Sequence, residues 1–238
     1  MKGPLAERLL SGPTPGPGLR AALAHVDSWL FDMDNTLYPA SVNLFAQIDR
    51  RMEAYVGRLL GLDRDGARAV QKRYFHEHGT TLRGLMLSHD VDPHDFLAFV
   101  HDIDFSVLSP DPGLRASLMA LGGRRFVFTN GDLPYAERVL SALGILDCFD
   151  AIHGIEAMDF HPKPDARAYD GVLARFGLDP RRTLFAEDMA ANLMPAKARG
   201  MTTLWVNNGS EWGAHGHSPA FVDHETHDLA HFLGAVVA

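Results

Sequence analysis

The sequence "SWLFDMDNTLYPAS", residues 28–41, places two carboxylates directly after a short apolar run. A run of this length, followed by polar residues, is typical of a strand buried on both faces of a parallel sheet. Asp32 and Asp34 would then stand at the carboxyl end of the strand, where open α/β sheets bind their ligands. Like charges this close raise each other's pKa unless a cation offsets them. The stretch therefore predicts a functional site at the end of the first strand.

Four more apolar runs follow the same plan along the chain. They are "RRFVFTNGD" (124–132), "CFDAIHGIE" (148–156), "RTLFAED" (182–188) and "MTTLWVNN" (201–208). Helical patterns lie between them, as in βαβ crossovers, and a short edge strand and a helix close the chain. The sequence predicts an α/β fold with a Rossmann-like parallel sheet.

The segment 42–108 has helical spacing throughout and no strand-like run. It predicts an all-helical insert between the first strand and the rest of the sheet. Residues 21–41 and 109–238 then form the core that contains the sheet. Residues 1–20 are rich in Pro and Gly and are interpreted as an N-terminal arm.

The overall composition narrows the classes of function. The 238 residues include 22 basic and 30 acidic ones, with a net charge of −8, which disfavours binding to a nucleic acid polymer or an anionic membrane. Cys148 is the single cysteine, so an intrachain disulfide is impossible. No apolar run approaches the ~20 residues of a membrane span. We expect a cytoplasmic protein; the sequence leaves its oligomeric state open.

Polar side chains follow several of the predicted strands and should meet at one edge of the sheet. They are Asp32 and Asp34 after the first run, Thr129 and Asn130 after the second, Glu187 and Asp188 after the fourth, and Lys163 before a helix that follows the third. Clustered acids need a cation, and oxygen ligands favour Mg²⁺. Acids, a hydroxyl, a lysine and Mg²⁺ together are the groups that phosphoryl transfer uses. The expected substrate is a small phosphomonoester.

Four of these residues receive catalytic roles. Asp32 attacks phosphorus and forms an aspartyl-phosphate. Asp34 protonates the leaving oxygen and then activates the water that hydrolyses the intermediate. Thr129 binds the transferring group, and Lys163 offsets charge on that group and on Asp32. The different roles of Asp32 and Asp34 account for their proximity.

The remaining residues would bind the metal and the phosphate. Asp188 would bind Mg²⁺, with Glu187 as a direct or water-mediated ligand, although an acid at a helix N-terminus is nearly as ordinary a reading of Glu187. The backbone amides around Asn130 and Gly131 would bind the phosphate. Asn130 could also cap the helix that follows it.

Four ordered motifs between residues 27 and about 208 resemble those of the haloacid dehalogenase-like phosphatases: "FDMDNT", "FTNGD", "KPDARAY" and "FAEDMAANLMPAKARGM". The resemblance implies a Rossmann-like catalytic core and a Mg²⁺ ion bound by Asp32, by the acids of the last motif and by the backbone carbonyl of Asp34. The helical insert 42–108 matches the cap that follows the first motif in that family. That last motif often reads Asp-Asp, whereas this chain has Glu187 and Asp188. The departure concerns the contact of Glu187 and not that of Asp188.

Within that family, "DNTLYPAS" and "YFHEHGTTLRGLM" are similar to the pyrimidine 5′-nucleotidase branch. The matching positions in the cap are Tyr74, Gly79, Thr81, Gly84 and Leu85. The similarity implies a nucleoside 5′-monophosphate such as UMP or CMP as substrate. Tyr38, Thr80 and Arg83 are candidates to line the base or ribose pocket. Core packing is the competing reading for Tyr38, and a solvated helix face is the competing reading for Arg83.

Other functions use much of the same residue set. A phosphatase or phosphomutase for a sugar phosphate or other small metabolite would keep the core and differ in the cap. A dehalogenase needs the nucleophile but not the acid two residues later. A non-catalytic domain that binds Mg²⁺ and phosphate has no need of a general acid, so the Asp32 and Asp34 pair favours an enzyme.

Overall fold

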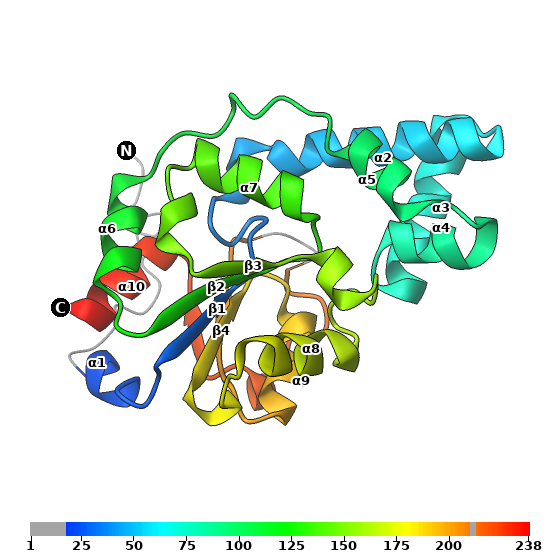
Figure 1. Cartoon of the computed structure of the whole chain (residues 1–238). Helices are drawn as coiled ribbons and strands as arrows, with labels where there is room; N and C mark the ends of the chain where they lie inside the picture. Colours follow the sequence, from blue (N-terminus) through cyan, green and yellow to red (C-terminus); the bar gives the residue numbers. More distant parts are fainter. Residues whose placement is uncertain (1–17, 210–212) are drawn as a thin grey trace, which may run out of the picture.

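The computed structural model describes residues 18–209 and 213–238 and contains a six-stranded parallel sheet (Figure 1). The strand order is β3-β2-β1-β4-β5-β6. The strands are β1 (Ser28–Phe31), β2 (Arg124–Phe128), β3 (Ala151–His153), β4 (Thr183–Glu187), β5 (Thr202–Val206) and β6 (His224–Thr226). The predicted Rossmann-like sheet is confirmed, because every expected run forms a strand and all pairings are parallel.

Strand β1 lies in the middle of the sheet, and this position accounts for its apolar sequence. Every residue of β1 and β4 is buried. In register, Leu30 lies opposite Phe126 of β2 and Phe185 of β4. Burying such side chains on both faces contributes roughly 1.5–3 kcal/mol each. The central position also means that residues just after β1 lie between those that follow β2 and β4.

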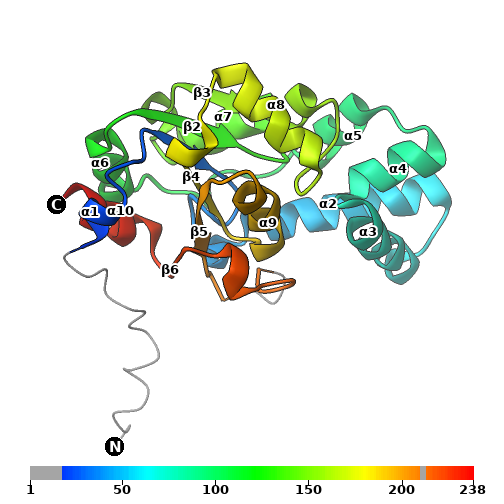
Figure 2. The same ribbon diagram turned by 90° about the horizontal axis from the view of Figure 1, so that it is seen from below.

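Helices cover both faces of the sheet, with α7 on one side and α8 and α9 on the other (Figures 1 and 2). The core α-helices are α1 (Leu19–Ala22), α6 (Pro112–Ala120), α7 (Leu133–Ala142), α8 (Ala166–Phe176), α9 (Ala190–Ala198) and α10 (Leu229–Val237). Short 3₁₀ segments are η1 (Ala40–Val42), η2 (Leu146–Cys148), η3 (Ile155–Met158), η4 (Pro180–Arg182) and η5 (Pro219–Phe221). The predicted arm lies largely outside the described residues; Leu19 and Arg20 belong to α1, which packs on α10.

Four helices separate β1 from α6 and project beyond the carboxyl ends of the strands (Figure 1). They are α2 (Leu44–Leu60), α3 (Arg64–His78), α4 (Thr81–His89) and α5 (Pro93–Val100). Asp63, Thr80 and Asp92 each accept a backbone hydrogen bond at a helix start, which satisfies an otherwise unpaired amide. The all-helical cap is confirmed. No helix within the described ranges has the length and apolar character needed to cross a bilayer.

One buried polar residue stands out in the core. His153 ends β3, is 1% exposed, and lies edge-on between the rings of Phe128 and Phe176. Neither of its ring nitrogens has a hydrogen-bond partner within the described structure. Burial, and secondarily the charge of Arg175, lowers the pKa of His153 from 6.5 to about 4. The imidazole is therefore held neutral at ordinary pH.

Candidate active site

The side chain of Lys163 joins the ends of three central strands. Its Nζ donates to Asp32 Oδ1 at 2.7 Å, to Glu187 Oε2 at 2.7 Å and to the carbonyl oxygen of Phe128 at 2.8 Å. An ammonium group has three donors, so all are used. Lys163 is 1% exposed. The predicted nucleophile and the predicted lysine are therefore in direct contact, although 131 positions separate them in sequence.

The second oxygen of Asp32 is also held. Thr36 Oγ1 donates to Asp32 Oδ2 at 2.9 Å, and the Asp32 amide extends the sheet by donating to the carbonyl oxygen of Ala186 at 2.9 Å. Each carboxylate oxygen keeps a further lone pair. Asp32 is thus fixed in direction while remaining able to form a bond to phosphorus. Sequence reasoning did not identify Thr36, although its place four residues after Asp32 was a usable signal.

The loop after β2 is attached to the backbone of the lysine loop. Asn130 accepts from the Lys163 amide at 2.8 Å and donates to the Lys163 carbonyl at 3.2 Å. The Gly131 amide donates to Thr129 Oγ1 at 3.0 Å, and Thr129 is 1% exposed. The side chain of Asn130 therefore positions the lysine loop. Phosphate binding by Thr129 and by the amides of Asn130 and Gly131 stays a prediction.

Three acids converge beside the lysine. One carboxylate oxygen each of Asp32, Glu187 and Asp188 lies within 4.8 Å of the others, and all three residues are buried. Asn208 Nδ2 donates to Asp188 Oδ2 at 3.0 Å. Three carboxylates against one ammonium leave a formal charge of −2. A hard divalent cation such as Mg²⁺ fits both this charge and this all-oxygen donor set.

The pKa directions agree with a site that needs a cation. Burial and the charge of Asp32 raise the pKa of Glu187 to about 7, although Lys163 opposes the change. Burial and the charges of Glu187 and Asp32 raise the pKa of Asp188 well above its ordinary value. For Lys163 burial acts to lower the pKa, but the charges of Asp32 and Glu187 prevail and raise it. A bound divalent cation would favour the ionised acids.

Glu187 has two partners that account for its burial. Its Oε2 accepts from Lys163, and its Oε1 accepts from the amide of Met189, the residue that caps α9, at 3.1 Å. Both readings of Glu187 offered by the sequence therefore have support: it lies at a helix start and it belongs to the acidic cluster. The backbone carbonyl of Asp34 stays a predicted metal ligand.

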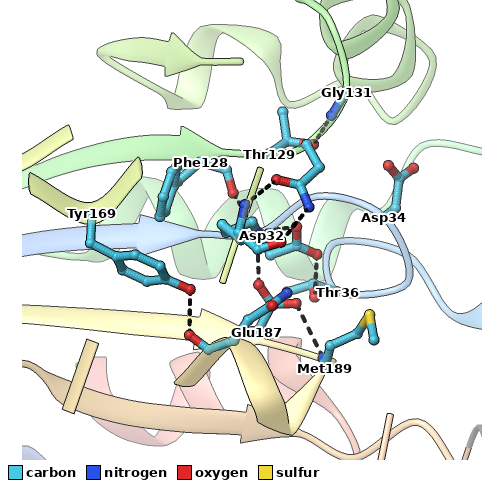
Figure 3. A network of polar contacts seen from close by, with 12 residues as sticks. Asp32, Asp34, Thr36, Phe128, Thr129, Gly131, Tyr169, Glu187 and Met189 are labelled. Atoms are coloured by element: carbon cyan, nitrogen blue, oxygen red, sulfur yellow. Dashed lines mark hydrogen bonds and ion pairs between the residues drawn. The ribbon is translucent and has the colours of Figure 1, made fainter. Parts of the chain in front are cut away.

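Asp34 points away from this network (Figure 3) and is held by two tyrosines. Tyr38 and Tyr135 each donate a phenolic hydrogen bond to Asp34 Oδ1, at 2.5 and 2.6 Å. Burial and the nearby charge of Asp32 raise the pKa of Asp34, although the two phenols oppose the change. A raised pKa suits a group that must first donate a proton. Tyr38, a candidate to line the base or ribose pocket, donates its hydroxyl to Asp34, and its contact with a substrate stays a prediction.

Sequence reasoning also missed Tyr135, which reads as a core residue in the helical pattern of α7. Its ring stacks on His101, with centroids 4.0 Å apart and an interplanar angle of 11°. His101 follows the cap helix α5 and is 8% exposed. No local pattern connects these residues, because Tyr135 is 101 positions from Asp34.

The turn between α3 and α4 carries the remaining cap candidates. Thr80 uses its hydroxyl to accept from the Arg83 amide at 3.1 Å, so its side chain caps α4. Arg83 is partly buried, and its charge, after burial and Arg167, helps lower the pKa of His161. A side-chain carbon added at Gly79 would lie 3.5 Å from the carbonyl oxygen of Lys163. The turn therefore lies against the lysine loop.

Packing accounts for part of the cap motif. A Cβ atom at Gly84 would lie 2.4 Å from two carbons of Tyr74, so α3 and α4 approach too closely for any side chain there. Tyr74 in turn shares a 2.7 Å hydrogen bond with His89 Nε2. Thr81 Oγ1 donates to the carbonyl oxygen of Gln71 at 3.3 Å. These motif positions join the cap helices to each other.

Comparison with known proteins shows the family. Residues 26–200 match the model of a family described as haloacid dehalogenase-like hydrolase. The range includes β1 through α9 and every acid of the cluster. The chain belongs to the haloacid dehalogenase-like hydrolase family.

Individual relatives include phosphatases. The Phosphate metabolism protein 8 of Saccharomyces cerevisiae is 29% identical over 208 residues, which cover 79% of this chain and 62% of the yeast protein's length. A Phosphoglycolate phosphatase of Yersinia pseudotuberculosis is 26% identical over 218 residues, with 87% and 90% covered. A solved HAD phosphatase from Thermococcus onnurineus superposes with a TM-score of 0.54 at 23% identity, over 84% of this chain and 93% of that one. This last likeness concerns the fold.

Proposed function

We propose that this protein is a Mg²⁺-dependent phosphomonoesterase that hydrolyses nucleoside 5′-monophosphates through an aspartyl-phosphate on Asp32. The observation that carries the proposal is the separation of two neighbouring carboxylates into different environments. Asp32 accepts from Lys163 on one carboxylate oxygen and from Thr36 on the other, so its direction is fixed. Asp34 lies among phenols, and its pKa is raised. One carboxylate suits nucleophilic attack and the other suits proton transfer.

The reaction takes two chemical steps. An oxygen of Asp32 bonds to phosphorus, the bond from phosphorus to the ester oxygen breaks, and the proton of Asp34 passes to the leaving alcohol. Asp34 then takes a proton from water as the water oxygen bonds to phosphorus. The bond from Asp32 to phosphorus breaks, and inorganic phosphate leaves. Asp34 ends the cycle protonated and Asp32 ionised, as they began.

The surrounding charges hold the reacting groups. Lys163 keeps Asp32 oriented and offsets negative charge on the transferring group. Asp32, Asp188 and Glu187, together with the predicted carbonyl of Asp34, would hold the metal. When bound, Mg²⁺ would neutralise charge on the phosphate oxygens.

The nucleotide assignment is supported by the cap turn and by the resemblance to the pyrimidine 5′-nucleotidase branch. The turn at Gly79 contacts the lysine loop, so its neighbours lie close to the space that a leaving group needs. The Thr80 hydroxyl already accepts a hydrogen bond from the Arg83 amide, and the Tyr38 hydroxyl already donates one to Asp34. Among the three candidates, Arg83 is therefore the one best placed to contact the base or ribose.

A smaller substrate is the second candidate. The Yersinia relative, aligned over 90% of its length, is named a Phosphoglycolate phosphatase. The core steps proposed above would apply unchanged to phosphoglycolate or to a sugar phosphate. In that case the guanidinium of Arg83 would pair with a carboxylate or hydroxyl of the substrate in place of a base.

Phosphate release from a panel of esters tests both candidates. The panel contains UMP, CMP, dUMP, AMP, IMP, a hexose phosphate and phosphoglycolate, each with Mg²⁺ and with chelator. Preference for pyrimidine monophosphates supports the nucleotidase assignment, and Arg83→Met should then raise KM more than it lowers kcat. Preference for phosphoglycolate or the hexose phosphate would keep the chemistry and discard the nucleotide. No release from any ester by the wild type would refute the phosphatase proposal.

A further inference from the structure

Two phenols hold one oxygen of Asp34. Tyr38 lies in the same loop as Asp34, and Tyr135 reaches it from α7; both donate to Oδ1. The two tyrosines are 3% and 1% exposed. Burial raises the pKa of both phenols well above 10, so they remain O–H donors. Hydrogen bonds of this kind to an ionised carboxylate are short and comparatively strong.

The two carboxyl oxygens of Asp34 have different surroundings. Two donors occupy the lone pairs of Oδ1. No hydrogen bond reaches Oδ2 from any residue in the described ranges, and Asp34 is partly exposed. A proton carried by Asp34 is therefore carried on Oδ2, the oxygen that stays available to a substrate.

Tyr135 is itself held from several directions. Its ring stacks on His101, and its amide donates to Asp132 Oδ1 at 2.9 Å. The same Asp132 oxygen lies 3.1 Å from His101 Nδ1. A Cβ at Gly131 would lie 2.8 Å from the Tyr135 ring, so only glycine leaves room for the ring there. The position of the phenol thus depends on the core and on a residue at the end of a cap helix.

We propose that Tyr38 and Tyr135 are positioning residues that turn Asp34 so that Oδ2 faces the leaving oxygen of the ester. The inference rests on the proposed function, because it assigns a geometry to its general acid. The O–H bond at Oδ2 breaks as the leaving oxygen takes the proton and its bond to phosphorus cleaves. Without the two hydroxyls the carboxyl group rotates among several orientations, and fewer of them can deliver the proton.

The inference predicts a loss that depends on the leaving group. An alkoxide, such as the 5′-oxygen of a nucleotide, needs a proton to leave. p-Nitrophenolate is stable without one. Positioning of the acid therefore matters for the first ester and hardly for the second. The ratio kcat/KM is the right quantity, because it covers the steps through cleavage of the ester and omits hydrolysis of the intermediate.

The experiment measures kcat/KM for the best alkyl ester of the panel and for p-nitrophenyl phosphate. The variants are Tyr38→Phe, Tyr135→Phe and their combination, with Asp34→Asn as comparator. Tyr55→Phe removes a phenol from the cap, where the Tyr55 ring packs on Phe96, and serves as the matched control. Thermal unfolding of each variant reports whether the fold is retained.

We expect each tyrosine variant to lose about 10- to 100-fold on the alkyl ester and less than about threefold on p-nitrophenyl phosphate. The double variant should approach Asp34→Asn on both substrates, and Tyr55→Phe should match the wild type. Equal losses on both esters, or none on either, would overturn the positioning role while leaving the phosphatase proposal standing. A wild type that releases phosphate from neither ester would overturn both.

Discussion

The buried histidine at the end of β3 makes the stability of this protein depend on pH in a calculable way. His153 has no hydrogen-bond partner in the described structure, and its pKa falls from 6.5 to about 4 on folding. At a pH between 6.5 and about 4, the His153 ring binds a proton in the unfolded chain but stays neutral in the folded chain. The neutral ring therefore contributes its full stability above pH 6.5, and that stability declines as pH falls toward 4.

The size of the effect follows from the two pKa values. One pKa unit corresponds to about 1.36 kcal/mol, so the free energy of unfolding should fall by about 2 kcal/mol at pH 5 and about 3 kcal/mol at pH 4 through His153 alone. Replacing His153 by Phe removes the proton site and retains an edge-on aromatic contact with Phe128. His153→Met is a second variant in case the larger ring is not accommodated.

The free energies of unfolding of the wild type and the two His153 variants are measured by urea unfolding, followed by circular dichroism, at pH 7.5, 6, 5 and 4. Wild type and variants share the acidic site, so its titration cancels in their difference. That difference should move by about 2 kcal/mol in favour of the variants between pH 7.5 and 5. His231→Gln, on an exposed position of α10, controls for loss of a histidine as such. Parallel curves for wild type and both His153 variants would refute the reasoning.

Three further predictions concern the site and the cap. Asp32→Asn should abolish phosphate release while the unfolding midpoint stays near that of the wild type, because the replacement is nearly isosteric; an active variant would overturn the nucleophile. Mg²⁺ should raise the thermal midpoint of the wild type, because a cation that binds only the folded state stabilises it, and should do so less for Asp188→Asn; an equal rise in both would remove Asp188 from the proposed metal site. Gly84→Ala should lower the free energy of unfolding in urea by about 1–3 kcal/mol, because the added Cβ would overlap Tyr74. Gly234→Ala is the control and should not lower it, because the nearest atom to the added Cβ lies at 3.7 Å. Equal effects of the two substitutions would contradict the close approach of α3 and α4.

Residues that follow the strands were predictable because sheet topology alone brings them together. Asp32, Lys163, Glu187 and Asp188 each follow an apolar run or precede a helix, and one edge of a parallel sheet collects such positions. The helical cap was predictable for a similar reason, since helical spacing is a local property.

Side-chain direction was less accessible to sequence reasoning. Tyr38 packs at the exit of β1, as expected of a tyrosine there, but the destination of its hydroxyl depends on how Asp34 is turned. Asp34 is turned by Tyr135, which a sequence-local pattern cannot link to it. Likewise Thr80 was a candidate for substrate contact, yet its hydroxyl caps α4. Polar side chains near a site often form hydrogen bonds with the neighbouring backbone, so they are not free to contact a ligand.

The bonds of Lys163 Nζ bear on how such an enzyme can be rebuilt. All three of its donors end on Asp32, Phe128 and Glu187, which belong to the ends of β1, β2 and β4. The ionic centre is thus assembled by the sheet, whereas the cap is one uninterrupted insertion between β1 and α6. An exchange of that insertion would leave the residues that form the ionic centre in place. A chimera with a foreign cap would need to restore the contacts that this cap makes with the core, among them the His101 ring stacked on Tyr135 and the Gly79 turn against the lysine loop.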